Sequence, residues 1–207
     1  MPRSPLVALA APTALVTGGL LVVTQFVQLA TIDRDDKTAM LANPVYVANA
    51  IAQFVAFALL PVVAVAAYAW QSDRAGRLGV AGLVAAIFGT VNLAGNYWFE
   101  AFAVPWLADA APDALTTPPS GVLLLGGASS YLLFAVGWVL FGIASLRARV
   151  FPTAISVAVI VGGVAGIQAV QPPLGVPLGL ALVWLGGWMV RREPAPVSAP
   201  AVREARS

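Results

Sequence analysis

The chain has 207 residues, of which 60% are hydrophobic and 10% are charged, and its formal net charge is +2. An average soluble domain has about 25% charged residues, so this chain has too few to cover a water-exposed surface. It contains no cysteine and no histidine, which excludes disulfides, thiolate catalysis, serine–histidine triads and metal sites built on those ligands. The composition is typical of a protein embedded in a lipid bilayer.

Six apolar runs follow one another along the chain, each close to the ~20 residues that a helix needs to cross the hydrocarbon core. Pro172 and Pro173 separate the last two runs and cannot continue a helix, so we expect a tight hairpin between two short spans, with a re-entrant pair as the alternative. We therefore predict an all-α fold, a single domain over residues 1–190 that forms an integral membrane bundle of six transmembrane helices. The runs cover residues 6–30, 46–70, 78–98, 121–144, 153–170 and 174–190.

Basic residues are distributed unevenly between the predicted loops. Only Arg34 and Lys37 lie on one side of the membrane, and the other nine lie on the opposite side. By the positive-inside rule, both the N-terminus and the C-terminus are cytoplasmic in a bacterial plasma membrane. The basic residues form no patch interleaved with aromatics, so we expect the lipid bilayer and no nucleic acid as partner. Residues 191–207 are rich in Pro, Ala and Arg, which predicts a disordered cytoplasmic tail.

Small residues recur at spacings that favour close helix packing. Gly162 and Gly166 form one GxxxG motif, and Gly175 and Gly179 form another. We interpret both motifs as packing surfaces within the bundle, with a dedicated dimer face as the alternative.

Polar side chains concentrate in the predicted outer halves of the spans. Asn92, Asn96 and Glu100 recur every four residues, which predicts one helical stripe. An amide left in lipid without a partner costs several kcal/mol, so we expect these groups to gather in a polar cavity open to the outer side. Interhelical hydrogen bonding is the alternative interpretation. The candidate ligand-binding residues are Gln25, Gln28, Asn49, Gln53, Asn92, Asn96, Tyr97, Ser130 and Gln168.

Glu100 is the one acidic residue within a span-like segment, near the predicted outer interface, and aromatic residues surround it in the sequence. An intramembrane ionisable group is a candidate functional residue, here a candidate catalytic acid; the alternative is a carboxylate at a helix end within an aromatic belt. The acidic segment TIDRDDKTAM lacks the spacing of a calcium loop, and Arg34 and Lys37 offset its charge. We expect a solvated loop there, and no metal or cofactor.

Three segments carry a resemblance to a known group. The chain contains YWFEAFAVPWLA, SLRARVFP and QPPLGVPLGLALVWLGGW, and it resembles a widespread group of small six-span membrane proteins of actinobacteria. That resemblance implies a six-span fold and a plasma-membrane location, and it carries over no catalytic or binding residues. A fainter likeness, limited to Glu100 beside Tyr97, Trp98 and Phe99, is to integral-membrane terpene cyclases, where an acid among aromatics protonates a prenyl chain.

Three functions remain open at this point. The first is binding, with transport as an extension, of a small amphipathic molecule or lipid in the outer cavity. The second is a membrane enzyme that uses Glu100 as general acid on an apolar, prenyl-like substrate. The third is an accessory subunit whose glycine-rich faces dock a larger membrane complex. The sequence leaves the ligand and the oligomeric state undetermined.

Overall fold

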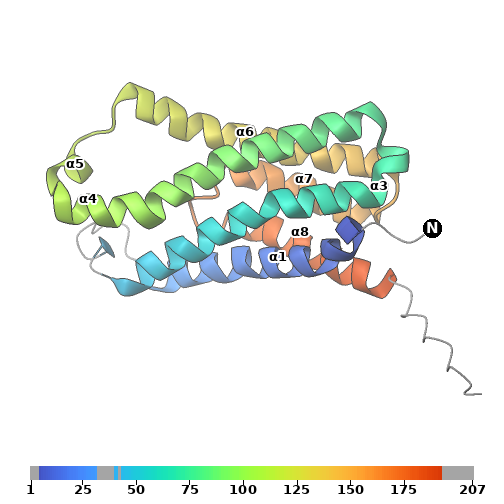
Figure 1. Cartoon of the computed structure of the whole chain (residues 1–207), viewed down its shortest axis with the longest axis horizontal. Coiled ribbons are helices and arrows are strands. Elements are labelled where there is room, and N and C mark those ends of the chain that lie inside the picture. The colour runs from blue at the N-terminus through green and yellow to red at the C-terminus, as the bar shows by residue number, and fades with distance from the viewer. Residues whose placement is uncertain (1–4, 32–39, 42, 193–207) are drawn as a thin grey trace, which may run out of the picture.

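The computed structural model describes residues 5–31, 40–41 and 43–192, and these residues form helices and turns without any strand. The long helices lie side by side along the long axis of the molecule (Figure 1). The first two residues of the predicted tail, Arg191 and Arg192, belong to the last helix. Residues 193–207 of that tail and the predicted acidic loop 32–39 lie outside the described residues. The elements are α1 (Pro5–Thr31), α3 (Pro44–Trp98), η1 (Phe99–Ala103), α4 (Val104–Ala110), α5 (Pro112–Thr116), α6 (Gly121–Ala148), α7 (Thr153–Ala165), η2 (Gly166–Gln168) and α8 (Val176–Arg192).

Three helical stretches are long and apolar enough to cross a membrane. They cover Val7–Thr31, Pro44–Ala110 and Gly121–Ala148, and a shorter apolar helix covers Thr153–Gln168. The prediction of an all-helical fold is therefore confirmed for the described residues, and three of the helical stretches have the length and composition of membrane spans.

The longest stretch folds back on itself at Gly76. This residue has φ 55° and ψ −158°, a conformation that glycine adopts readily and that strains residues with a Cβ atom. The turn divides α3 into a first limb (residues 44–75) and a second limb (residues 77–98), which run back along each other (Figure 1). Helix continues through η1 and α4 to Ala110, beyond the predicted end at Trp98.

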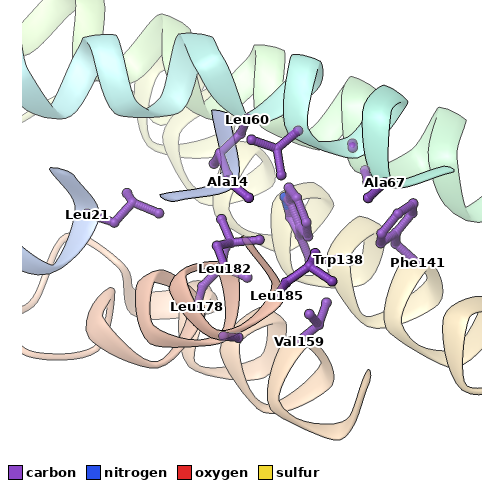
Figure 2. Packing of buried hydrophobic residues seen from close by; sticks show 14 of the residues in the cluster. Ala14, Leu21, Leu60, Ala67, Trp138, Phe141, Val159, Leu178, Leu182 and Leu185 are labelled. Atoms are coloured by element: carbon purple, nitrogen blue, oxygen red, sulfur yellow. The ribbon is translucent and has the colours of Figure 1, made fainter. Parts of the chain in front are cut away.

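Trp138 of α6 lies at the centre of the bundle (Figure 2). Its side chain is 1% exposed, and it packs among Leu60 of the first limb, Val159 of α7 and Leu182 of α8. The indole Nε1 donates a hydrogen bond of 2.9 Å to Thr90 Oγ1 of the second limb. One aromatic side chain therefore joins four helical segments and still satisfies its own polar atom.

Glycines bring the second limb of α3 close to α6. A Cβ atom at Gly89 would lie 2.3 Å from the Leu133 carbonyl oxygen, and one at Gly137 would lie 2.4 Å from the Ala85 carbonyl oxygen. Both distances are too short for real contacts. The two backbones therefore meet directly, which compensates for the lack of a hydrophobic driving force between helices in lipid.

The predicted GxxxG motifs also pack within the chain. Gly162 of α7 lies against Leu178 of α8, and Gly179 of α8 lies against Gly18 of α1. Gly166 lies against Phe134 of α6, and Gly175 lies against the Gln25 side chain from the turn that precedes α8. All four glycines thus pack within the chain, although Gly175 does so from outside a helix.

Two of the helices are short. α7 has 13 residues and α8 has 17, which correspond to about 20 and 26 Å of helix, less than the ~30 Å of a hydrocarbon core. The chain reverses between them through residues 169–175, and Pro172 and Pro173 lie in this turn as predicted. The turn contacts Gln25 of α1, which lies six residues before this helix ends at Thr31. The turn between α7 and α8 therefore does not reach as far as the C-terminal end of α1.

Gly89→Ala is expected to destabilise the fold, because its methyl group would push the second limb away from the α6 backbone. We expect a loss of about 1–3 kcal/mol, seen as a lower midpoint of thermal unfolding in detergent. Gly19→Ala in α1 is the control, since a Cβ atom there meets nothing within 4 Å. Equal midpoints for the two variants would contradict the close approach.

Candidate functional site

A cavity of about 670 Å³ lies between the helices at the end of the bundle that carries α4 and α5. One side, which we call the polar wall, is formed by α1, both limbs of α3 and η1. The opposite side, the α6 wall, is largely apolar. The polar wall consists of Gln28, Tyr46, Asn49, Gln53, Asn96, Tyr97 and Glu100, and the α6 wall of Leu123, Leu124, Gly127, Ala128 and Tyr131.

Glu100 lies in a wide helical turn. In η1 the backbone N–H of Val104 donates to the carbonyl of Phe99, five residues earlier instead of four. Such π turns shift the direction of the side chains that follow and often occur at functional sites. The Glu100 carboxylate accepts a hydrogen bond from the Tyr46 hydroxyl of the first limb. The bond joins the first limb of α3 to η1 at the cavity.

Three amides of the polar wall are almost fully buried. Gln28 and Gln53 are each 4% exposed and Asn49 is 6% exposed. Gln53 Nε2 donates to Gln28 Oε1 over 3.4 Å. Within the described residues, nothing bonds to the Gln28 amide nitrogen, the Gln53 carbonyl oxygen or the Asn49 side chain. These three side chains line the cavity, so water or a polar group of a ligand inside the cavity can satisfy their remaining polar atoms.

Asn96 and Tyr97 are both bound into the surrounding helices. The Asn96 amide donates to Ser130 Oγ of α6, and this hydroxyl in turn donates to the Gly127 carbonyl over 2.7 Å. Tyr97 stacks on Phe57 of the first limb with ring centroids 4.3 Å apart. Ser130 is buried behind the cavity lining. Asn96 and Ser130 therefore form an interhelical hydrogen bond, the second of the two roles that the sequence left open.

Gln25 lies next to the cavity and holds the turn between α7 and α8. Its Nε2 donates to the Ala169 carbonyl over 3.0 Å, and its Oε1 accepts from the Gly175 backbone N–H over 3.1 Å. Residues 169–175 lie outside regular helix, so their backbone groups need such partners. The adjoining Val170 lines the cavity, so Gln25 positions one of its walls.

Two predicted site residues lie elsewhere. Asn92 is exposed, and its amide donates to the Phe88 carbonyl of its own helix over 2.8 Å. Four residues correspond to 400° of helix, which is about 40° more than one full turn. Each residue of the predicted stripe is therefore rotated by about 40° from the one before, and Asn92 points away from the face that Asn96 shares with Glu100. Gln168 is exposed in η2, because α7 ends at Ala165 and the chain already turns there. Neither residue lines the cavity.

Tyr46 is a site residue that the sequence interpretation missed. It lies three residues before Asn49 and seven before Gln53, a spacing that places all three on one helical face. That spacing could have indicated it, but a tyrosine at the start of an apolar run also fits an aromatic belt at the membrane interface.

Most of the described charges are separated between the two ends of the bundle, although Asp73 lies with the arginines near the turn of α3. Glu100, Asp109 and Asp113 lie at the cavity end. Among the described residues, no group of three or more Asp or Glu side chains is placed to hold a metal ion. The described basic residues lie at the opposite end, where α3 turns and where α6 and α8 end: Arg74, Arg77, Arg147, Arg149, Arg191 and Arg192.

Comparison with known proteins does not place the chain in a family. No family model, no curated protein and no solved structure matches it significantly. The resemblances noted from the sequence therefore stay predictions, and any functional proposal depends on the geometry of the cavity.

Gln25→Met is expected to loosen the turn between α7 and α8, because it removes both bonds to Ala169 and Gly175 while preserving side-chain volume. Leaving two buried backbone groups without partners should cost about 2–4 kcal/mol in total. Faster amide hydrogen exchange at Gly175 and a lower unfolding midpoint would show this. Gln168→Met, at an exposed position, is the control, and unchanged exchange in Gln25→Met would contradict the assigned role.

Proposed function

We propose that the chain is a multi-pass protein of the bacterial plasma membrane that crosses the bilayer six times, with both termini in the cytoplasm. The crossing segments are α1, the two limbs of α3, α6, α7 and α8. The clustering of the described arginines at one end supports this orientation, because basic residues favour the cytoplasmic face. The N-terminus of α1 and the C-terminus of α8 lie at that same end (Figure 1). The cavity then faces the outer half of the bilayer.

Cysteine labelling tests this topology directly, since the native chain has no cysteine. Ser72→Cys lies near the turn of α3, and Thr117→Cys lies between α5 and α6; both positions are exposed. In sealed right-side-out vesicles, a membrane-impermeant maleimide should label Thr117→Cys and leave Ser72→Cys unmodified until the membrane is opened. Labelling of Ser72→Cys in sealed vesicles would overturn the orientation.

We further propose that the protein binds a small amphipathic molecule in this cavity. The observation that carries the proposal is the set of buried amides, Gln28, Asn49 and Gln53, whose unsatisfied atoms converge on a space next to an apolar wall. Water or the polar head of a ligand satisfies those atoms, and the apolar part of the ligand lies against Leu123 and Leu124 of α6. A volume of about 670 Å³ is within the range of small-molecule sites.

The α6 wall also provides a route from the bilayer. Gly121 to Gly126 are exposed, and Val122 and Leu125 have 83% and 71% of their surface accessible. The first turns of α6 therefore pack loosely against the rest of the bundle, next to Leu123 and Leu124. An amphipathic molecule in the outer leaflet can enter the cavity past the first turns of α6, and its apolar chain stays in contact with lipid as it does so.

Binding fits the shape of the cavity better than conduction. Toward the arginine-bearing end, the polar wall is followed by the aromatic and aliphatic core around Phe57, Phe134 and Trp138. A polar path through the bundle would have to displace this core. Catalysis is the second candidate, and it is favoured by the placement of the Glu100 carboxyl in the cavity with Tyr46.

Gly127→Trp and Gly126→Trp form a matched pair for testing the binding site. A Cβ atom at either glycine meets nothing within 4 Å, but only Gly127 lines the cavity. With a diazirine-bearing dodecanol in maltoside micelles, we expect saturable photolabelling of the cavity segments around Tyr46 and Tyr131. Gly127→Trp should weaken it by about tenfold or more, equivalent to ~1.4 kcal/mol, and Gly126→Trp should not.

Photolabelling that is equal in both variants, or that excess unlabelled dodecanol fails to compete, would argue against a cavity site. Chemical conversion of the probe by the native protein, lost in Glu100→Gln, would mark catalysis instead of binding alone.

A further inference from the structure

The charge of the cavity is set by one carboxylate. Glu100 is half-buried, and the structure gives its side chain a neutral partner, the Tyr46 hydroxyl. No lysine or arginine occurs among the residues that line the cavity in the described part of the chain. A carboxylate in such a low-dielectric setting is stabilised by a positive charge nearby.

The surroundings of the cavity add negative charge. Asp109 and Asp113 lie on the same end of the bundle, and the described arginines lie at the other end. Charges of one sign around a cleft concentrate ligands of the opposite sign.

Aromatic rings complete the surroundings that suit a cation. Tyr46, Tyr97, Phe99 and Tyr131 all line the cavity with Glu100. The faces of aromatic rings attract ammonium groups, by about 2 kcal/mol or more when water is excluded. Leu123 and Leu124 supply an apolar surface for an attached chain.

We infer that the ligand of this cavity is an amphipathic cation, a long-chain amine or quaternary ammonium compound. This inference rests on the proposed binding function and names the chemical class of its ligand. The cationic group lies by Glu100 and the aromatic rings, and the alkyl chain lies along the α6 wall. An anionic amphiphile is rejected, because its charge would face Glu100 without any basic side chain among the described lining residues.

Three photoactivatable probes with the same dodecyl chain test the inference: one ends in trimethylammonium, one in a hydroxyl and one in sulfate. Trimethylammonium has no dissociable proton and donates no conventional N–H hydrogen bond, so its advantage over the alcohol reports charge and ring contact. In nonionic micelles we expect the native protein to bind it at least about tenfold more tightly than the alcohol, equivalent to ~1.4 kcal/mol, and to bind the sulfate least.

Variants of Glu100 identify the source of the preference. Glu100→Gln should abolish the advantage of the trimethylammonium probe over the alcohol, whereas Glu100→Asp, which keeps the charge, should retain most of it. Asp73→Asn is the matched control, because Asp73 is exposed near the turn of α3 at the opposite end of the bundle and does not line the cavity; it should leave the preference nearly unchanged. Unfolding midpoints of all variants establish that they fold.

The outcomes separate the two proposals. If the alcohol and trimethylammonium probes bind equally to the native protein and both are blocked by Gly127→Trp, the cavity binds amphiphiles and the inference of a cation is wrong. If the sulfate probe binds best, the inference is also wrong. If Gly127→Trp blocks none of the three probes, the proposed binding function fails as well. The comparison of probes on the native chain decides the matter even if Glu100→Gln does not fold.

Discussion

Three helical stretches of this chain have the length and composition to cross a bilayer, whose hydrocarbon core offers no hydrogen bonds, and the polar groups of the bundle are arranged in keeping with that constraint. Helices satisfy their own backbones, so the polar side chains and the non-helical turn need partners of their own. Trp138 donates a hydrogen bond to Thr90, and Asn96 donates one to Ser130. Gln25 bonds to two backbone groups of residues 169–175. Gln28, Asn49 and Gln53 instead face the cavity, where part of their hydrogen-bonding capacity is left for partners inside it.

The cavity exists because the helices differ in length and in closeness of approach. α7 and α8 are too short to reach the end of α1, and their connecting turn lies beside the cavity instead of filling it. Glycines pull the second limb of α3 onto α6 around Gly89 and Gly137, while the first turns of α6 stay exposed. The tightly packed half of the bundle thus gives rigidity to a site formed in the loosely packed half.

Much of the candidate site could be predicted from depth in the membrane. Gln28, Asn49, Gln53, Asn96 and Glu100 come from α1, the two limbs of α3 and η1, yet hydropathy predicts them at a similar level, and they line one cavity. The spacing of Asn92 from Asn96 is nearly one helical turn and predicts a shared face, but a spacing of four accumulates rotation and leaves Asn92 exposed. Tyr46 was missed because its role depends on Glu100, 54 residues away along the chain.

Hydropathy and the positions of prolines were enough to establish an all-helical chain with spans of membrane length, because both act over a few neighbouring residues. Hydrogen-bond partners come from distant segments, so no local pattern specifies them. Packing alone decided that Gln25 supports the turn at Ala169 and Gly175, and that Gln28, Asn49 and Gln53 face a shared space. The π turn at Phe99–Ala103 likewise depends on the contacts around it, and Glu100 lies within that turn.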